Sequence, residues 1–452
     1  MDKYLDMIKK VVFVCPTGEL SAGGEISNFE LIKYLVKQNI SVHVITAREG
    51  DYNKVLSDNK IDNSVGNYGW WNPEWGYGHK NINSIKHIVH TIKSTKPDVV
   101  VTNTLNIPWG ALASAMTNTP HVWIGREFPL EEFTYLTEKI DFIKKFSNAV
   151  TANSVQLSEY ITSQYNFPVE YFYSYVNVDD VKAGGDSSAI RIVSPNAIVQ
   201  RKNQKELLKA LVILKNKNPK FNTKVVLMGE ENEPYRKEID NFISKNKIEE
   251  LVEIVGFVDN PWSLVGKNDI MVQTSLSESI GRTTTEAMKL GIPVIVSDIP
   301  GHKEALSLGG GVSYKSENPN DLAEKIQKVL NNPKKARMIA KKAQEKVLVN
   351  LSENACNKPF VKTLERVVGK DNPMKELQNI EPYWTAYVND NENELNLKTG
   401  EILKYAHEYI PKKEYDDIKR EMNDLKKSKT YKLARAASKS YNRTKDLLRG
   451  RI

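Results

Sequence analysis

The residues whose types and spacing could do chemistry gather after a predicted strand at Asp269–Val272. A segment rich in Ser and Thr follows this strand, and after Gly281 the sequence predicts a helix at Thr283–Leu290. The first N–H groups of a helix have no partner within the helix and lie at the positive end of its dipole. The segment therefore predicts an anion-binding site, which Glu278 and Glu286 would flank.

Glu278 and Glu286 cannot hold an anion by charge, because carboxylates repel it. We expect them to accept hydrogen bonds from hydroxyl groups, such as those of a sugar and a ribose. The spacing also fits a simpler interpretation, in which the two carboxylates complement the helix dipole or pair with Arg282.

A second candidate is the glycine-bearing segment 18–24, between a predicted strand at Val11–Val14 and a predicted helix at Glu25–Lys37. Its spacing differs from the dinucleotide-binding pattern. Gly23 and Gly24 could bring backbone amides close to a ligand, or they could only form a tight turn before the helix.

A third candidate is the glycine-rich loop at 67–78, which contains Trp70, Trp71 and Trp75. Aromatic rings of this kind stack on the faces of sugars, so we expect the loop to line the side of the site that binds an acceptor. The same side chains could instead fold back onto the domain as a small aromatic core.

Two successive α/β patterns would position these residues. In both halves of the chain, short β-branched runs alternate with helical segments, which is typical of parallel sheets covered by helices on each side. The predicted strands are Val11–Val14, Ser41–Ile45, Asp98–Val101, His121–Ile124, Ile190–Val193, Lys224–Met228, Val252–Val255, Asp269–Val272 and Pro293–Val296. Further helices are predicted at Lys205–Lys215 and Glu233–Lys245. Doubly wound domains bind ligands at the carboxyl ends of their strands, so the chemistry is expected in the loops that follow strands.

The expected fold class is α/β, with two Rossmann-like domains facing a central cleft and a basic helical C-terminal extension. We expect an N-terminal domain at 1–182, a linker at 183–189 and a C-terminal domain at 190–345. A helix at 346–370 is expected to pack back toward the N-terminal domain, and 371–452 is expected to form a helical basic tail. The linker prediction rests on small, polar and glycine residues.

Composition excludes several classes of protein. A chain of 452 residues exceeds what one hydrophobic core normally serves, and 40% hydrophobic with 27% charged residues is typical of globular domains. Cys15 and Cys356 provide no disulfide framework and are expected to be buried in a reducing cytoplasm. No targeting segment is expected.

The uncharged stretch 99–125 contains Pro108 and Pro120, so we expect two buried strands and a short helix there rather than a membrane span.

The net charge of +8 is concentrated at one end of the chain. The segment 426–452 holds ten Lys or Arg against Asp446 alone, so the rest of the chain is close to neutral and does not indicate a nucleic-acid-binding protein. One helical face of this tail would carry the apolar residues Leu433, Ala437, Tyr441 and Leu448. Such a helix could lie on an anionic bilayer, or it could be solvated or form a coiled coil.

The segment around Glu278 and Glu286 resembles the Glu-seven-Glu motif of glycosyltransferase family 4. Three further segments match that family in the same order, namely its base-binding loop at Val255–Val258, its Ala-Asp-Val strand at Asp269–Ile270 and its Gly-Gly-Ile-Pro-Glu segment at Pro300–Glu304. The resemblance covers roughly residues 10–365 and is strongest over 190–330.

This resemblance implies a GT-B enzyme that transfers a sugar from a nucleotide-sugar donor, without a metal and with retention of anomeric configuration. No cofactor is expected beyond the donor, which is expected to be UDP-linked. By position, Glu286 would bind the ribose, Glu278 the donor sugar, and the amides of Arg282 and Thr283 after Gly281 the distal phosphate. The base would lie against Gly256, Phe257 and Val258. Gly23 and Gly24 resemble the family's Gly-Gly loop, whose amides approach the donor phosphates or the acceptor.

Lys202, in the segment 200–204, resembles the family's phosphate-binding lysine. Cations here would stabilise the charge that a leaving nucleoside diphosphate gains in the transition state. The family's Gly-Arg is absent a few residues earlier, where 194–197 is Ser-Pro-Asn-Ala, so Arg201 could replace that guanidinium. The alternative is a solvated Arg-Lys pair at the start of a helix.

Arg126 is the clearest departure from the family. Many relatives have a histidine near the donor sugar where this chain has Arg126-Glu127. Arg126 cannot be a general base, because a guanidinium stays protonated at any working pH. The departure therefore bears on the identity of the donor sugar more than on activity, unless Arg126 and Glu127 form an ordinary surface pair.

The expected function is a retaining, hexosyl-type glycosyltransferase that extends a bacterial cell-surface glycan, glycolipid or glycoprotein. Its expected partners are the nucleotide sugar, a glycan, lipid-linked or protein acceptor, and a membrane surface contacted by 426–452, with no nucleic acid. The expected location is the cytoplasm, at the inner face of the cell membrane. The alternatives are a sugar-nucleotide epimerase and a catalytically silent GT-B partner that recruits a glycosylation complex to the membrane. Turnover of the donor separates the enzyme from the silent partner.

Overall fold

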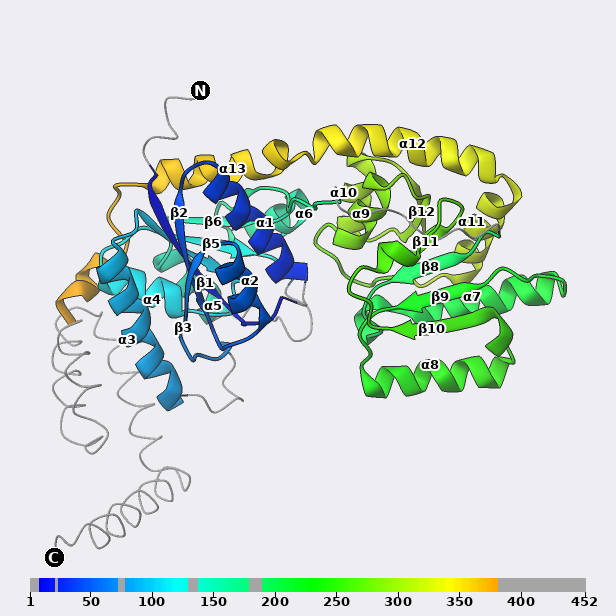
Figure 1. Cartoon of the computed structure of the whole chain (residues 1–452), viewed down its shortest axis with the longest axis horizontal. Coiled ribbons are helices and arrows are strands. Elements are labelled where there is room, and N and C mark those ends of the chain that lie inside the picture. Colours follow the sequence, from blue (N-terminus) through cyan, green and yellow to red (C-terminus); the bar gives the residue numbers. More distant parts are fainter. Residues whose placement is uncertain (1–7, 21–22, 72–77, 129–136, 179–188, 381–452) are drawn as a thin grey trace, which may run out of the picture. The chain divides into compact units, whose positions relative to one another are not determined.

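The computed structural model describes residues 8–20, 23–71, 78–128, 137–178 and 189–380. Within this part of the chain lie two Rossmann-like domains, each a parallel sheet with helices packed around it (Figure 1). The predicted α/β class is therefore confirmed.

The N-terminal domain contains a seven-stranded sheet in the order β3-β2-β1-β4-β5-β6-β7, with every pair parallel. Its strands are β1 (Lys10–Cys15), β2 (Ser41–Thr46), β3 (Asp62–Val65), β4 (Val99–Asn103), β5 (His121–Gly125), β6 (Ala149–Ala152) and β7 (Glu170–Tyr171). Its helices are α1 (Gly23–Lys37), α2 (Asp51–Asp58), α3 (Gly78–Thr95), α4 (Trp109–Met116), α5 (Thr137–Lys145) and α6 (Val155–Tyr165). All residues of β4 and β5 are buried, as expected of strands covered on both faces.

The C-terminal domain contains a six-stranded parallel sheet in the order β10-β9-β8-β11-β12-β13. Its strands are β8 (Ile192–Pro195), β9 (Val225–Met228), β10 (Val252–Gly256), β11 (Ile270–Gln273), β12 (Val294–Ser297) and β13 (Val312–Tyr314). Its helices are α7 (Gln204–Lys217), α8 (Glu233–Asn246), α9 (Arg282–Lys289), α10 (Pro300–Leu308), α11 (Pro319–Asn331) and α12 (Pro333–Asn350), with short 3₁₀ turns η4 (Gln200–Lys202), η5 (Glu249–Leu251) and η6 (Pro261–Leu264).

The last described elements return to the N-terminal domain. Helix α13 (Glu353–Val367) places Phe360, Val361, Leu364 and Val367 in the same hydrophobic core as Phe13 and Phe172. The rings of Phe172 and Phe360 lie 4.9 Å apart between centroids. A final 3₁₀ turn, η7 (Lys375–Ile380), follows.

All nine predicted strands are present, and their ends differ from the predicted ends by at most two residues. The stretch 99–125 forms β4, α4 and β5 as predicted, and none of the described helices is long and apolar enough to cross a membrane. The strands that the sequence did not predict, β3, β6, β7 and β13, have two to four residues and lack the apolar β-branched run that indicated the four-residue strands β8, β9, β11 and β12. Short strands carry little periodic pattern, because two to four residues hold at most two repeats of the alternation.

The predicted start of the first helix is wrong. Helix α1 begins at Gly23, so Gly23 and Gly24 belong to its first turn instead of a preceding loop. The low helix propensity of glycine made a turn the natural prediction. The absence of a side chain at Gly23 leaves room for Arg282 of the other domain, whose Cδ would lie 3.2 Å from a Cβ atom there.

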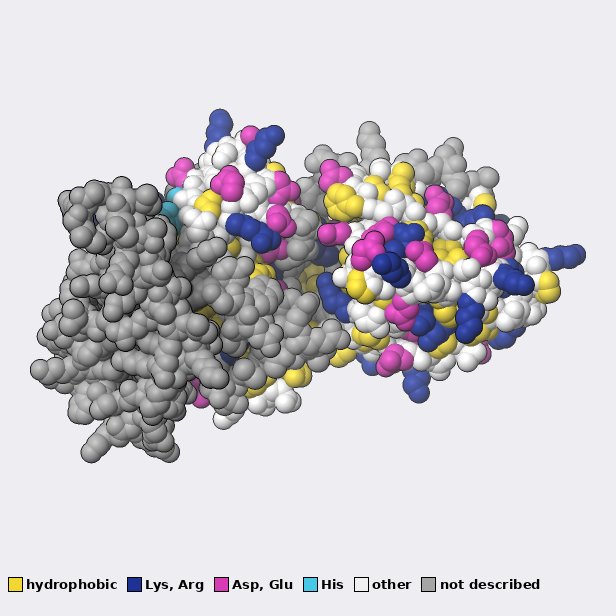
Figure 2. All heavy atoms as spheres, turned by 90° about the horizontal axis from the view of Figure 1, so that it is seen from below, with side chains coloured by type: hydrophobic (Ala, Val, Ile, Leu, Met, Phe, Trp, Pro, Cys, Tyr) yellow, Lys and Arg dark blue, Asp and Glu magenta, His cyan; other side chains and the backbone are white. Residues whose placement is uncertain are grey.

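Charged side chains of both signs are mixed over the described surface of the C-terminal domain. Figure 2 shows Lys and Arg interspersed with Asp and Glu on the face seen there. This mixing agrees with the near-neutral charge of the chain outside 426–452.

Candidate active site in the C-terminal domain

The candidate site lies where the order of the C-terminal sheet reverses. Strand β8 has β9 on one side and β11 on the other. The loops that follow β8 and β11 therefore leave adjacent strand ends in opposite directions. Ligands of open α/β sheets bind in this position. Two hydrogen bonds join these loops, from the amide of Leu276 to the carbonyl of Arg201 at 2.9 Å and from Thr274 Oγ1 to the carbonyl of Lys202 at 2.9 Å.

Helix α9 presents its N-terminus at this edge of the sheet. Gly281, the residue before the helix, has a φ of 75°, a left-handed conformation that favours glycine. The N–H groups of Arg282 and Thr283 lie in the first turn, where no carbonyl of the helix can reach them. The Thr284 hydroxyl fixes this turn by donating to Gln273 Oε1 at 2.6 Å.

Glu278 and Lys202 form an ion pair beside this helix start. Each side chain is only 12% exposed, and the Glu278 carboxylate also accepts from Gln273 Nε2 at 3.0 Å. Burial raises the pKa of Glu278, but the positive charge of Lys202 and smaller effects of His302 and Arg201 outweigh it and lower the pKa to about 2. Glu278 is therefore ionised at neutral pH.

Lys202 is not a solvated cation, so that alternative is wrong for this residue. Its ammonium is enclosed, and burial lowers its pKa although Glu278 opposes the shift. Arg201 behaves differently, because its side chain is exposed. The structure thus brings Lys202 and Glu278 together across 76 positions of sequence and leaves Arg201 at the rim.

Glu286 is held one turn inside α9 by two donors. Its carboxylate accepts from Arg282 Nη2 at 2.9 Å and from Trp262 Nε1 at 2.9 Å. The pairing with Arg282 that the spacing allowed is present. Trp262 lies in η6 and was not singled out from the sequence, because one Trp after Asn-Pro has no distinctive pattern.

The predicted base-binding residues end β10 at the same edge of the sheet. Gly256 has a φ of 80°, and the Phe257 side chain is 63% exposed. Val258 follows in the loop that leads to η6. Trp262 of η6 donates a hydrogen bond to Glu286, so the loop after β10 and the Glu286 carboxylate of α9 lie at the same edge of the sheet.

His302 lies buried beneath the start of α9. It belongs to the Pro300–Glu304 segment, but it was not predicted as a site residue. Its Nδ1 lies 3.0 Å from Ser297 Oγ, and its Nε2 has no hydrogen-bond partner among the described residues. Burial lowers the pKa of His302 to about 4, although the Glu278 carboxylate acts in the opposite direction. His302 is therefore neutral at pH 7. A Cβ atom on Gly281 would lie 3.2 Å from its ring, so the histidine supports the turn.

Arg126 is buried, so the alternative of an ordinary surface pair with Glu127 is wrong. The Arg126 side chain is 6% exposed. It donates to Asn103 Oδ1, to Ser174 Oγ at 3.3 Å and to Asn28 Oδ1 at 3.4 Å. These three acceptors are neutral, and the nearby carboxyl groups of Glu127 and Glu25 act against the lowering of the Arg126 pKa by burial.

Two arginines from different domains approach the start of α1. Arg126 Cδ lies 3.4 Å from where a Cβ atom on Gly24 would stand, and Arg282 Nη1 donates to Ser27 Oγ at 3.2 Å. Glu25, which the sequence did not mark, is buried beside them, and burial raises its pKa to about 7. The N-terminal domain therefore contributes charged groups of both signs to this region.

Two family models cover most of the described chain. Residues 21–180 match the model described as Glycosyltransferase Family 4, and residues 179–346 match the model described as Glycosyl transferases group 1. These matches place the chain among the glycosyltransferases.

Relatives of known name agree with this family. An uncharacterized glycosyltransferase of Methanocaldococcus jannaschii is 29% identical over 210 residues, which are 44% of this chain and 56% of that protein. The O-antigen biosynthesis glycosyltransferase WclY of Escherichia coli is 42% identical over 60 residues, 13% of this chain and 17% of WclY. The chain thus matches about half of the first relative and a smaller part of the second.

The fold of this glycosyltransferase is shared with solved structures. The crystal structure of Anabaena HepE in complex with UDP-glucose has a TM-score of 0.66 and 20% identity, covering 79% of this chain and 99% of HepE. At this identity the likeness shows the GT-B fold.

The aromatic loop of the glycosyltransferase belongs in part to its core. Trp71 packs edge-on against Phe142 at 5.0 Å and Trp123 at 6.4 Å between ring centroids, and Lys139 Nζ lies 5.5 Å from its ring. Trp71 therefore packs partly buried against the core, as the aromatic-core alternative describes, and its role on the acceptor side stays a prediction. Trp70 is half-buried, and Trp75 lies outside the described residues.

The two cysteines are free and buried, as predicted. Burial raises the pKa of Cys356 to about 12, which keeps its thiol protonated. Among the described residues, no group of three His, Cys, Asp or Glu could hold a metal ion.

Proposed function

We propose that this glycosyltransferase transfers a sugar from a nucleotide-sugar donor to a hydroxyl group, with retention of configuration and without a metal. The observation that carries the proposal is the N-terminus of α9 at the switch point of the C-terminal sheet, flanked by the Lys202–Glu278 pair. An open helix N-terminus suits a phosphate. HepE, which shares the fold, is described in complex with UDP and with UDP-glucose.

In this proposal each charged group at the edge has a separate task. The amides of Arg282 and Thr283 hold the distal phosphate, because they point out of the first turn of α9. Glu286, fixed by Trp262 and Arg282, accepts hydrogen bonds from the ribose hydroxyls. Glu278 is ionised and accepts from a hydroxyl of the donor sugar.

Lys202 supplies the positive charge that the reaction needs. When the bond between the anomeric carbon and the phosphate oxygen breaks, its electron pair stays on the nucleoside diphosphate. A buried ammonium near that oxygen stabilises the leaving group more than the intact donor. Arg201 at the rim adds charge without burial.

We extend the proposal to the acceptor and to the place of the reaction. The relative WclY is named for O-antigen biosynthesis, which supports a cell-surface glycan or its lipid-linked precursor as acceptor. The tail at 426–452, with ten Lys or Arg, would bring the enzyme to the cytoplasmic face of an anionic membrane. The donor is proposed to be UDP-linked.

The test is a screen of the purified full chain against UDP-, GDP-, ADP- and TDP-sugars, with thermal shift and nucleotide release as the two readouts. We expect one donor class to raise the melting temperature and to release its nucleotide slowly. Glu286→Ala should weaken the binding of that donor at least tenfold, because the ribose hydroxyls lose their hydrogen-bond acceptor.

The matched control is Glu324→Ala, which removes an exposed carboxylate of α11 in the same domain. It should bind the donor as the wild type does. Binding without any release of nucleotide would contradict the transferase proposal. Equal donor affinity in Glu286→Ala and Glu324→Ala would contradict the proposed site.

A further inference from the structure

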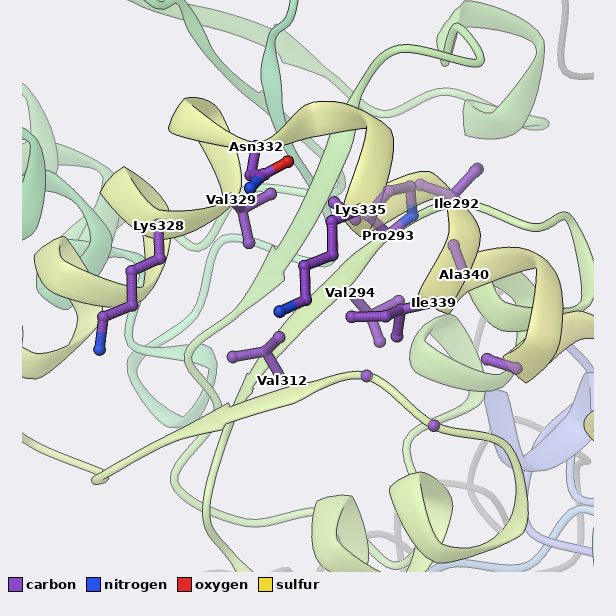
Figure 3. A pocket seen from close by; sticks show the side chains of 14 residues that line it. Ile292, Pro293, Val294, Val312, Lys328, Val329, Asn332, Lys335, Ile339 and Ala340 are labelled. Atoms are coloured by element: carbon purple, nitrogen blue, oxygen red, sulfur yellow. The ribbon is translucent and has the colours of Figure 1, made fainter.

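The C-terminal domain contains a pocket that the proposed reaction does not use. It has a volume of about 320 Å³ and lies between α11, α12 and the start of β12 and β13 (Figure 3). Its walls include Ile292, Pro293 and Val294 at the start of β12, and Gly311 and Val312 at the start of β13. The pocket is therefore at the amino ends of these strands, whereas the proposed donor site is at the carboxyl ends. Its volume falls at the lower end of the range of small-molecule sites.

The interior of this pocket is apolar. Val294, Val329, Ala340 and Ala343 contribute buried side chains, with at most 9% of each exposed. Gly311 contributes only backbone, because a Cβ atom there would lie 2.4 Å from Cγ2 of Val294. A space of this size and lining can accept an alkyl chain.

The polar residues of the pocket are cations and one amide. Its fourteen lining residues include Lys328, Lys335 and Asn332, and none of the fourteen is Asp or Glu. Both lysines are exposed, and no hydrogen bond or ion pair joins either amine to another described residue. Figure 3 shows the amine of Lys335 extending toward Val312 on the opposite wall. The pocket thus combines an apolar interior with positive charge.

The exposed flank of α12 continues from Lys335 as a stripe of basic and apolar side chains. Spacings of three and four residues place on this flank the exposed residues Lys335, Met338, Lys342, Lys346 and Val349. Met338 is 53% exposed and Val349 is 70% exposed. The whole helix carries six Lys or Arg against one Glu. Cations mixed with exposed apolar groups favour contact with an anionic bilayer.

Charge excludes one occupant that belongs to this chain. The basic tail at 426–452 has ten Lys or Arg, so Lys328 and Lys335 would repel it. We propose that the pocket binds the alkyl chain of an anionic membrane lipid, whose head group lies on Lys328 and Lys335. The site is separate from the donor site, so it stands or falls independently of the proposed reaction.

The first test measures binding of single-chain alkyl phosphates to the full chain by titration calorimetry, below their critical micelle concentrations. Octyl, decyl and dodecyl phosphate should bind with affinity rising about fourfold for each added CH₂, until the pocket is full. Decyltrimethylammonium, which has the same chain and the opposite charge, should bind at least tenfold more weakly than decyl phosphate. Equal affinity for the two head groups would overturn the proposal, and so would an affinity independent of chain length.

One double variant on α11 and α12 locates the site, and a double variant on α12 is its control. Lys328→Glu/Lys335→Glu should weaken the binding of decyl phosphate at least tenfold, because the phosphate head group is then repelled by negative charge. Lys334→Glu/Lys341→Glu makes the same change in charge at exposed positions that do not line the pocket, and it should bind as the wild type does. Equal loss in both double variants would mean a non-specific effect of charge and would overturn the site.

A third variant tests the apolar interior without changing the charge. Ala336→Phe inserts a ring at a half-buried lining position, and it should shorten the longest alkyl chain that still gains affinity. An unchanged dependence on chain length in a folded Ala336→Phe would contradict an alkyl site in this pocket.

Vesicles decide whether a membrane supplies the lipid. The full chain should co-sediment with phosphatidylglycerol vesicles more than with phosphatidylcholine vesicles, and Lys328→Glu/Lys335→Glu should lower this binding more than Lys334→Glu/Lys341→Glu does. Because the basic tail is present in every protein compared, it cannot produce that difference. If the two double variants bind vesicles equally, a membrane lipid is excluded as the occupant.

Discussion

At the scale of single residues, the site depends on opposite charges that are buried together. Lys202 and Glu278 are each 12% exposed, and their charges are tolerated only because each compensates the other. Burial disfavours the charged form of Glu278, yet its pKa lies at about 2 because Lys202, together with smaller effects of His302 and Arg201, outweighs burial. A carboxylate that stays ionised beside a helix N-terminus can accept hydrogen bonds from hydroxyl groups of a ligand. It does not bind an anion at that helix N-terminus, because the two negative charges repel each other.

We expect Lys202→Met to lower the free energy of unfolding by about 3–5 kcal/mol, because it leaves the Glu278 carboxylate buried without a counter-ion. Lys202→Met/Glu278→Gln should lose less than the sum of the two single variants, since neither charge then remains alone. Urea unfolding of the four proteins measures this coupling. Strict additivity would show that the two side chains do not compensate each other.

The buried His302 predicts a dependence of stability on pH. Its pKa in the folded protein is about 4, against about 6.5 in an unfolded chain, so the unfolded chain binds more protons between these values. The contribution of neutral His302 is therefore complete above pH 6.5 and is lost as the pH falls toward 4. His302→Gln should remove this loss, so that the wild type weakens relative to the variant by about 2 kcal/mol between pH 7 and pH 4.5.

The comparison with the variant is needed because other buried groups titrate in the same range. His121, with a pKa lowered to about 3 by burial, acts with the same sign, whereas Glu25 and Glu206, with pKa values raised to about 7 by burial, act with the opposite sign. Lys303→Ala, an exposed change on the same helix as His302, is the control and should follow the wild type over this pH range. Parallel curves for wild type and His302→Gln would rule out a buried neutral histidine.

At the scale of elements, close backbone packing of α10 on the preceding loop fixes the start of α9. A Cβ atom on Gly301 would lie 2.2 Å from the carbonyl oxygen of Glu278 and 2.4 Å from that of Ser279. Glycine is therefore required at this position of α10 for the loop to stay where it is. The geometry of the loop that carries Glu278 therefore depends on a helix that begins about twenty residues later in the sequence.

Gly301→Ala should lower the free energy of unfolding by about 1–3 kcal/mol, because the added methyl group meets backbone atoms that must shift. We also expect weaker binding of the nucleotide sugar, since the moved loop carries Glu278. Urea unfolding and donor titration measure the two effects. Lys303→Ala, an exposed change on the same helix, should alter neither. Normal donor binding by Gly301→Ala would show that the loop tolerates the displacement.

Most elements could be predicted from sequence pattern, and the errors have local causes. The longer strands of both sheets carry β-branched runs, so their positions follow from residues next to one another. The start of α1 was predicted two residues too late, because the low helix propensity of Gly23 and Gly24 favours a turn. The short strand β13 was missed because three residues give almost no periodicity.

At the scale of the whole molecule, hydrogen bonds join the two domains near the site. The Glu304 carboxylate of α10 accepts from the amides of Val155 at 2.7 Å and Gln156 at 2.9 Å, at the start of α6. Ser154 Oγ lies 2.9 Å from Ser279 Oγ, in the loop that carries Glu278. Charge-assisted bonds of this kind contribute more than neutral ones, so α6 and α10 form a specific contact.

Glu304→Ala should weaken the contact between the domains by about 1.5–3 kcal/mol for each of the two hydrogen bonds lost. We expect a larger radius of gyration in solution scattering and a higher KM for the donor. Glu324→Ala, which removes an exposed carboxylate elsewhere in the C-terminal domain, should scatter as the wild type does. Identical scattering of all three proteins would show that this contact does not hold the domains together.

The sequence by itself determined the two α/β domains, nine of the thirteen described strands and the candidate carboxylates Glu278 and Glu286. These features depend on residues close together in the chain, where periodicity and spacing act. The tertiary structure decided that Lys202 neutralises Glu278, that Arg126 is buried and that Trp71 belongs to the core. Burial and ionisation depend on groups that meet only after folding, because the dielectric environment of a side chain is set by its neighbours in space.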